Sequence, residues 1–238
     1  SMNTVKIDKK NVLMIAHRGL SGIETENTEC AFVAAGNRSY YGIETDVHLT
    51  KDGKYVVHHD ENLQRVFGVN ALIKDMTFDE IRKIQRSENG EKAAYSVVPT
   101  LKEYLDTCKK YEKKSVLELK IEYDEKRLQE IIAEVEKAGQ TDDIIYISFY
   151  ASDIEKMRKL LPTARLQFLC GEINDQTIDF CVKNGADIDV GYPALTKETV
   201  AKLKSAGVKI NCWTVNDKAV AENLVSLGVD YITTNILE

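Results

Sequence analysis

The chain has 238 residues, of which 43% are hydrophobic and 29% are charged, and its formal net charge is −6 at pH 7. This composition supplies enough apolar residues for one sizeable core, and the length suits a single large α/β domain over residues 1–238. No run of Lys and Arg is long enough to follow a phosphate backbone, so we expect no nucleic-acid partner.

The N-terminal part of the chain predicts a strand followed by a helix. The continuous apolar run Val12–Ala16 is typical of a strand that is buried on both faces. It is too short for the apolar region of a signal peptide or for a membrane span. A helix should follow, with Thr25 or Asn27 as its N-cap and Cys30–Ala35 as its apolar body.

The next segment predicts a β-hairpin. A strand covers about residues 42–50, the turn sequence Lys51–Gly53 follows it, and Tyr55–His58 returns as a second strand. A connection this short joins only antiparallel strands. The hairpin should therefore carry His59 and Asp60 back to the first strand.

Residues 61–98 do not fit a strand–helix unit. They contain a helical patch near Thr77–Arg86 and a polar stretch, Ser87–Lys92. We interpret them as a small cap that is inserted after the hairpin.

From Pro99 onwards, predicted helices and strands alternate regularly. The helices cover residues 100–114, 124–138, 151–161, 175–184, 196–206 and 217–227, and the strands cover 115–121, 143–149, 165–169, 187–190, 208–213 and 231–234. Such alternation gives either a doubly wound sheet or a closed barrel. Apart from the hairpin return there are eight strands, which favours a (β/α)₈ TIM barrel with its chemistry at the C-terminal ends of the strands.

The cysteines bear on where the protein functions. The five cysteines are scattered, and none forms a CxxC pair. This pattern favours reduced thiols over a disulfide framework or a zinc site. We therefore expect a cytoplasmic protein without stable membrane insertion, and the sequence leaves its oligomeric state open.

The predicted strand over residues 42–50 carries two acids, Glu44 and Asp46, whose side chains share one face because they are two residues apart. Two adjacent carboxylates repel each other unless a proton or a cation lies between them. Glu118 and Lys120 show the same spacing late in the next barrel strand. Three carboxylates form an all-oxygen site suited to a divalent cation, Mg²⁺ or Ca²⁺.

Cationic and titratable residues are predicted at the same end of the barrel. Arg18 and Lys120 would add positive charge beside the metal, and such an arrangement suits a phosphate group. His17 and His59 have imidazoles that titrate near neutral pH, so the pair fits one proton acceptor and one proton donor across a phosphodiester bond. Trp213 ends the seventh barrel strand.

These motifs occur in one characteristic order along the chain. They are His17-Arg18-Gly19, Glu26-Asn27-Thr28, Glu44-Thr45-Asp46-Val47, His59-Asp60, Pro99-Thr100-Leu101, Glu118-Leu119-Lys120, Ser148-Phe149 and Trp213-Thr214. In these motifs the chain closely resembles the glycerophosphodiester phosphodiesterase family. The resemblance implies a TIM barrel whose family insertion coincides with residues 61–98.

The resemblance also implies a function, namely metal-dependent hydrolysis of glycerophosphodiesters to sn-glycerol 3-phosphate and an alcohol. By position, it implies metal ligands at Glu44, Asp46 and Glu118, an acid–base pair at His17 and His59, phosphate contacts at Arg18 and Lys120, and a glycerol-pocket wall at Trp213. It suggests that the substrate's own glycerol hydroxyl attacks and forms a cyclic phosphate. The sequence leaves open that step, the role of each histidine, the metal and the alcohol.

The chain departs from the family pattern at three positions. Thr25 stands where the family usually has Pro, Tyr150 where Asp often follows Ser-Phe, and Asn235 where the last strand usually ends in Asp. None of these departures removes a proposed ligand or base. The last two change the rim of the site and therefore bear on the choice of head group.

Two other functions are consistent with part of this pattern of residues. A phosphoinositide-lyase-like or phospholipase-D-like barrel would need a wide apolar mouth for lipid, and the predicted cap has only scattered apolar residues. A non-catalytic barrel that binds phosphodiesters would be expected to lack a ligand or a base, and none is lacking here.

Several polar and aromatic residues have structural explanations. His48 and His58 are interpreted as structural, and Phe149 as a packing residue. Asp60 is interpreted as a partner of a site residue or as a turn former. Glu26 is interpreted as a capping group or as a partner of a site residue.

Overall fold

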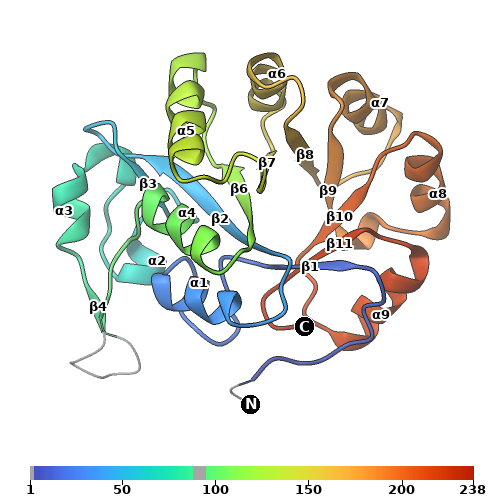
Figure 1. Ribbon diagram of the computed structural model, residues 1–238, viewed down its shortest axis with the longest axis horizontal. Coiled ribbons are helices and arrows are strands. Elements are labelled where there is room, and N and C mark those ends of the chain that lie inside the picture. Colours follow the sequence, from blue (N-terminus) through green and yellow to red (C-terminus); the bar gives the residue numbers. More distant parts are fainter. Residues whose placement is uncertain (1–2, 88–94) are drawn as a thin grey trace.

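Eight parallel strands form the centre of the protein in a computed structural model that describes residues 3–87 and 95–238 (Figure 1). They are β1 (Leu13–Ala16), β2 (Gly42–Leu49), β6 (Lys114–Leu119), β7 (Ile144–Ser148), β8 (Arg165–Cys170), β9 (Asp187–Gly191), β10 (Ile210–Trp213) and β11 (Tyr231–Thr234). They pair in the order β10-β9-β8-β7-β6-β2-β1-β11.

The two ends of this sheet meet and almost close it into a barrel. The backbone N–H of Asp230 donates to Ile210 O at 2.9 Å, and that of Val215 donates to Thr233 O at 3.0 Å, which joins the β10 and β11 segments. The predicted (β/α)₈ TIM barrel is therefore confirmed.

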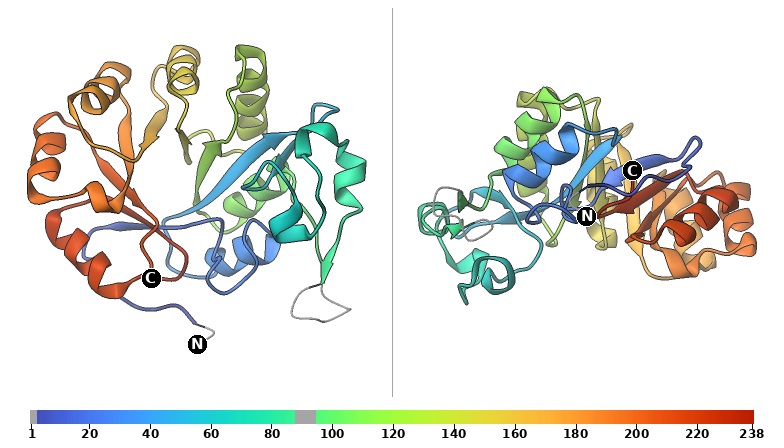
Figure 2. Two further views of the ribbon diagram at one scale, coloured as in Figure 1. Left: turned by 180° about the vertical axis from the view of Figure 1, so that it is seen from behind. Right: turned by 90° about the horizontal axis from the view of Figure 1, so that it is seen from below.

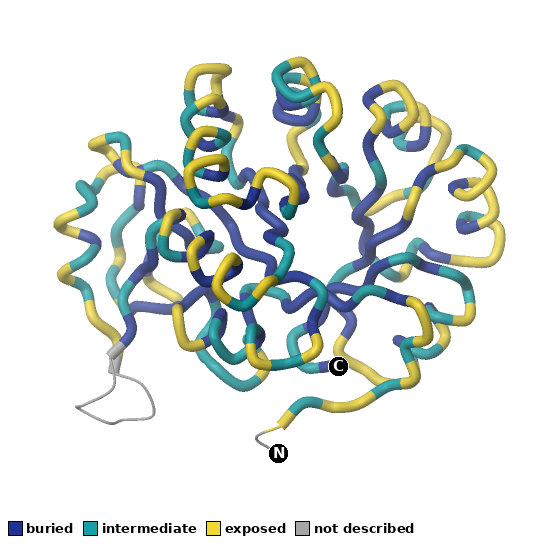
Figure 3. Tube along the Cα trace, viewed as in Figure 1, coloured by how far each residue is buried: buried dark blue, intermediate teal, exposed yellow. Residues whose placement is uncertain are grey.

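Helices surround the strands on the outside (Figures 1 and 2). They are α1 (Glu29–Gly36), α4 (Leu101–Lys110), α5 (Glu125–Lys137), α6 (Ala151–Leu160), α7 (Asp175–Asn184), α8 (Lys197–Ser205) and α9 (Lys218–Leu227), with the 3₁₀ turn η3 (Tyr192–Ala194) before α8. In α5, for example, Leu128, Ile131 and Val135 are buried at helical spacing and face the strands. Figure 3 shows the same division, with buried residues along the strands and exposed residues on the outer surfaces of the helices.

The start of α1 differs from the prediction. Thr28, and neither Thr25 nor Asn27, is the N-cap, because its extended backbone lets its hydroxyl accept from the Ala31 N–H. Asn27 instead adopts a left-handed conformation with φ of 52°, which Asn tolerates better than most residues. Its side chain is thereby directed to the barrel mouth.

The hairpin strand β3 (Tyr55–Val57) pairs antiparallel with β2, so that Val57 lies opposite Val47. The inserted segment that follows contains α2 (Gln64–Phe67), η1 (Ile73–Asp75), α3 (Phe78–Arg82), β4 (Arg86–Ser87) and β5 (Tyr95–Ser96). The helix predicted near residues 77–86 is shorter than expected, because the chain leaves α3 at Arg82 and enters β4, which pairs antiparallel with β5. Most of the predicted polar stretch, from residue 88 on, lies outside the described residues.

The cap contains its own apolar cluster, separate from the main core. Its buried members are Val56, Leu63, Val66, Phe67, Ile73, Ile81 and Val98. The apolar residues of the cap therefore pack against each other and the hairpin. No helix within residues 3–87 and 95–238 is long and apolar enough to span a membrane.

His48 and His58 lie in the hairpin and make structural contacts. The His48 ring Nε2 lies 3.0 Å from the backbone O of His59. The His58 ring packs against Phe67 in the cap, with the ring centroids 5.8 Å apart. His58 is buried and its Nε2 has no hydrogen-bond partner among the described residues, and this burial lowers its pKa to about 4.

The buried His58 should make stability depend on pH. The unfolded chain binds a proton at this residue below about pH 6.5 whereas the folded chain does so only near pH 4, so stability falls as the pH drops through this window. When the pH is lowered from about 7.5 to about 5, the free energy of unfolding should fall by about 2 kcal/mol more in the wild type than in His58→Leu. Urea unfolding of both proteins at the two pH values measures this difference, and parallel pH profiles would contradict it.

Candidate functional site

The C-terminal ends of the barrel strands open into a cavity of about 220 Å³. It is lined by His17, Arg18, Glu44, His59, Glu118, Lys120, Ile147, Phe149, Leu169, Asp189, Trp213, Thr214 and Thr233. A larger hollow of about 470 Å³ beside α5 is lined by none of the predicted site residues. The smaller cavity is therefore the candidate site.

Three carboxylates form a cluster at this cavity, and two of them, Glu44 and Glu118, line it. Glu44, Asp46 and Glu118 are all buried, and each has a carboxylate oxygen within 4.8 Å of one oxygen of the other two. The parallel pairing of β2 with β6 places Asp46 directly beside Glu118, and Glu44 shares the face of Asp46. Lys120 Nζ lies 3.5 Å from Glu118 Oε2.

The cluster is electrostatically costly without a cation. Burial and the neighbouring carboxylates raise the pKa of Glu44 and of Glu118 well above the usual range. Burial opposes ionisation of Asp46 too, but His59 and Lys120 hold its pKa below the usual value. Asp46 Oδ1 is buried and has no hydrogen-bond partner in the described part of the chain. Both the oxygen donors and this unpartnered atom fit a divalent cation.

Asn27 holds Asp46 in place, a role that the sequence analysis missed. Its side-chain amide donates to Asp46 Oδ2 at 3.0 Å, while its Oδ1 accepts from the Thr45 hydroxyl at 2.7 Å. Arg18, just after β1, supports the other acid, because its backbone N–H donates to Glu44 Oε2 at 2.8 Å. The short polar segment before α1 therefore orients two members of the cluster.

His17 is fixed at the end of β1 by the last segment of the chain. Its Nδ1 lies 2.7 Å from Asn235 Oδ1, one of the rim positions at which the sequence departs from the family pattern. Burial and the adjacent Arg18 lower the pKa of His17 to about 4. The ring is therefore neutral at neutral pH in the protein without ligands.

His59 reaches the cavity through the hairpin, as predicted from the short turn. The backbone N–H of His58 donates to Asp46 O at 3.0 Å, which anchors this segment beside β2. The His59 Nδ1 lies 2.7 Å from Asp60 Oδ1, and its Nε2 lies 3.3 Å from Lys120 Nζ. Asp60 is thus a partner of His59.

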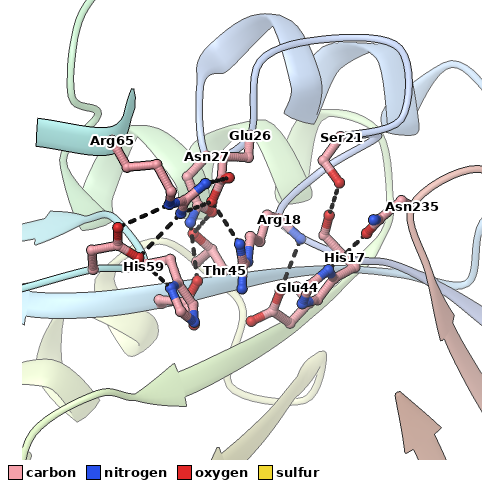
Figure 4. Close-up of polar contacts among 12 residues, drawn as sticks. His17, Arg18, Ser21, Glu26, Asn27, Glu44, Thr45, His59, Arg65 and Asn235 are labelled. Carbon is pink, nitrogen blue, oxygen red and sulfur yellow. Dashed lines mark hydrogen bonds and ion pairs between the residues drawn. The ribbon is translucent and has the colours of Figure 1, made fainter. Parts of the chain in front are cut away.

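Arg65 in the cap helix α2 connects the two sides of the site (Figure 4). Its guanidinium contacts Asp60, with Nε 2.9 Å from Oδ2, and Glu26, with Nη2 3.0 Å from Oε2. Glu26 in turn accepts from Arg18 Nη1 at 2.8 Å. Glu26 therefore acts as a partner of Arg18 and does not cap α1, and the cap is tied to both Arg18 and His59.

The remaining wall of the cavity is mainly apolar. Trp213 ends β10, and its indole N–H donates to the backbone O of Asp189 at 3.1 Å. Its ring meets Phe149 edge to face, with the centroids 5.9 Å apart. Phe149 therefore lines the cavity, whereas the sequence predicted a packing residue, because it follows the last residue of β7 and remains half exposed.

The chain is similar to known phosphodiesterases. The sequence model of the glycerophosphoryl diester phosphodiesterase family matches residues 17–238. A glycerophosphodiester phosphodiesterase of Caldanaerobacter subterraneus subsp. tengcongensis is 33% identical, and the match covers 94% of this chain and 93% of that protein. One of Bacillus altitudinis is 32% identical, with 93% and 94% covered.

Solved structures agree with this similarity. A glycerophosphodiester phosphodiesterase from Parabacteroides distasonis has a TM-score of 0.79 and is 30% identical, with 94% of this chain and 93% of that chain covered. A phosphodiesterase of Oleispira antarctica, solved in complex with its product sn-glycerol 3-phosphate, has a TM-score of 0.84 at 24% identity and covers 97% of this chain and 96% of its own. The latter shares the fold.

A cation that relieves the repulsion in the carboxylate cluster should stabilise the folded chain. At about 100 times the dissociation constant, Mg²⁺ or Ca²⁺ should raise the melting temperature by roughly 5–10 °C. Glu44→Gln and Glu118→Gln should lose most of this shift, whereas Glu198→Gln on the exposed surface of α8 should keep it. Thermal unfolding with and without each cation measures the effect, and equal shifts in all four proteins would refute the proposed cation site.

Proposed function

Because the chain belongs to the glycerophosphoryl diester phosphodiesterase family, we propose that it hydrolyses glycerophosphodiesters to sn-glycerol 3-phosphate and an alcohol. The observation that carries the proposal is one cavity that joins a buried carboxylate cluster, two cationic side chains and two histidines. These are the groups that phosphodiester cleavage requires, namely charge stabilisation and proton transfer on both sides of the phosphorus.

The anionic phosphodiester would bind between the cluster and the two cationic side chains. Glu44, Asp46 and Glu118 would hold Mg²⁺ or Ca²⁺, which when bound would supply positive charge to the phosphate oxygens and lower the pKa of a nearby hydroxyl. Arg18 and Lys120 would contact the phosphate and stabilise the charge that develops in the transition state.

His59 is the proposed proton acceptor. Hydrogen bonds from Arg65 and His59 hold the pKa of Asp60 well below its usual range, so Asp60 is a carboxylate and His59 Nδ1 must donate to it. The other ring nitrogen, Nε2, accepts a hydrogen bond from Lys120 Nζ at 3.3 Å. When Lys120 turns to the phosphate, Nε2 would accept the proton of an attacking hydroxyl. Asp60 would then stabilise the imidazolium that forms. The attacker is a hydroxyl of the substrate glycerol or of water.

His17 is the proposed proton donor. With Nδ1 fixed by Asn235, its Nε2 is the ring nitrogen left for the substrate. To act as the donor, the ring must first gain a proton on Nε2, and the negative charge of the bound phosphodiester would favour this by raising the low pKa that burial gives His17. The leaving oxygen thereby departs as a hydroxyl group and not as an alkoxide.

The lipid-active alternatives receive less support. In the described part of the cap, residues 61–87 and 95–98, most apolar side chains pack into a cluster of their own and leave no broad apolar surface for a membrane. We therefore propose a small water-soluble glycerophosphodiester as the substrate.

Removal of either histidine or of the cation should abolish most turnover. With glycerophosphocholine or glycerophosphoethanolamine, His17→Asn and His59→Asn should each lower kcat by about 10²–10⁴-fold, because each removes one proton transfer. His58→Leu is the matched control and should keep the wild-type rate. Release of glycerol 3-phosphate is measured with Mg²⁺, with Ca²⁺ and with EDTA, and turnover that survives EDTA would count against the proposal.

Arg65 should affect the rate without touching the substrate. Arg65→Ala frees Asp60 and Glu26 and should lower kcat by roughly 10–100-fold, the cost of a lost positioning contact. Arg82→Ala is the matched control, because Arg82 also lies in the cap and makes a two-point pair, there with Glu103. Steady-state kinetics of both variants measure the two changes in kcat. An equal decrease in kcat would mean that activity requires a folded cap but no specific contact of Arg65.

A further inference from the structure

Asp189 on β9 contributes a carboxyl group to the cavity wall opposite the charged groups. It is 2% exposed, and its Oδ1 is buried with no hydrogen-bond partner in the described ranges. Its neighbours on this wall include the apolar side chains of Leu169 and Trp213. Burying a carboxyl oxygen without a hydrogen-bond partner reduces the stability of the fold, so we looked for a ligand that this group could bind.

Within residues 3–87 and 95–238, no hydrogen bond or ion pair of the fold uses this carboxyl group. The polar side chains in the barrel interior near β9 satisfy each other: Asn211 donates to Gln167 Oε1 at 2.9 Å and accepts from the Thr233 hydroxyl at 3.0 Å. The indole N–H of Trp213 donates to the backbone oxygen of Asp189 and not to its carboxyl group. Asp189 is also absent from the group of carboxylates whose oxygens lie within 4.8 Å of one another.

The chemistry of the group indicates what it binds. Burial raises the pKa of Asp189 to about 8, so the carboxyl is largely neutral at neutral pH. A neutral carboxyl group donates one hydrogen bond and accepts others. Its natural complement in an apolar pocket is therefore a hydroxyl group, which also donates and accepts.

We propose that Asp189 is a specificity residue that hydrogen bonds the terminal hydroxyl of the substrate's glycerol half. This inference rests on the proposed function. The charged side of the cavity would take the phosphate, and the hydroxyl next to the phosphate would stay near it. The terminal hydroxyl reaches furthest and meets the opposite wall, where Leu169 and Trp213 contact the carbon chain. The variable alcohol would then lie towards the open mouth.

The test compares two substrates with the same alcohol and the same hydroxyl beside the phosphate. One is the glycerophosphodiester, and the other is the propane-1,2-diol 1-phosphodiester, in which the terminal hydroxyl is replaced by hydrogen. Wild type should prefer the glycerol substrate by about 100-fold or more in kcat/KM, because the deoxy analogue leaves Asp189 unpartnered. Asp189→Leu should lower this preference to nearly one, and Asp189→Asn, whose amide still hydrogen bonds, should lie between.

Each outcome has one meaning. Wild type that cleaves both substrates equally well, or Asp189→Leu that keeps the preference, overturns the role of Asp189 while the hydrolase function stands. Wild type that cleaves neither overturns both proposals. Thermal unfolding shows whether the variants fold, and Asp189→Leu should be at least as stable as wild type because it removes an unpartnered buried carboxyl group. Calorimetric binding of glycerol 3-phosphate and propane-1,2-diol 1-phosphate to wild type gives the same comparison without a variant.

Discussion

The mutual repulsion of three buried carboxylates is the constraint on which the site depends. Hydrogen bonds between β2 and β6 fix Asp46 beside Glu118, so the acids cannot move apart without breaking the barrel. Their neighbours are arranged to limit the cost, with the Arg18 N–H on Glu44 and the Asn27 amide on Asp46. A rigid scaffold thus holds charge in an arrangement that a flexible loop would relax, which is the general advantage of placing such groups on barrel strands.

Much of the fold and the centre of the site could be predicted because local rules determine them. Alternation of buried strands with helices predicted the barrel, and the spacing of Glu44 and Asp46 predicted their shared face. The short turn after β2 placed His59 near both acids. Contacts between distant segments could not be predicted in this way. Arg65 lies 39 residues from Glu26 in the sequence, and only folding of the cap brings the two together.

Asp189 illustrates a second limit of the sequence. Asp187 and Asp189 stand two residues apart on one strand, as Glu44 and Asp46 do, yet their surroundings differ. Asp187 accepts a hydrogen bond from the Lys209 N–H, at 2.9 Å, near the start of the strand. Asp189 lies further along, where the barrel opens into the cavity. The spacing of the acids is the same in both pairs. The position of each residue along the strand decides whether it has a partner, as Asp187 does, or lacks one, as Asp189 does.

The separate apolar cluster of the cap affects how the protein loses activity when it is heated or denatured. The cap supplies Arg65, yet its core is distinct from that of the barrel, so the two need not melt together. Partial opening of the cap would release Asp60 and Glu26 from Arg65 while the barrel stayed intact. Heat or denaturant would then inactivate the enzyme before most of its secondary structure is lost, and the cap would set the working temperature range of the whole chain.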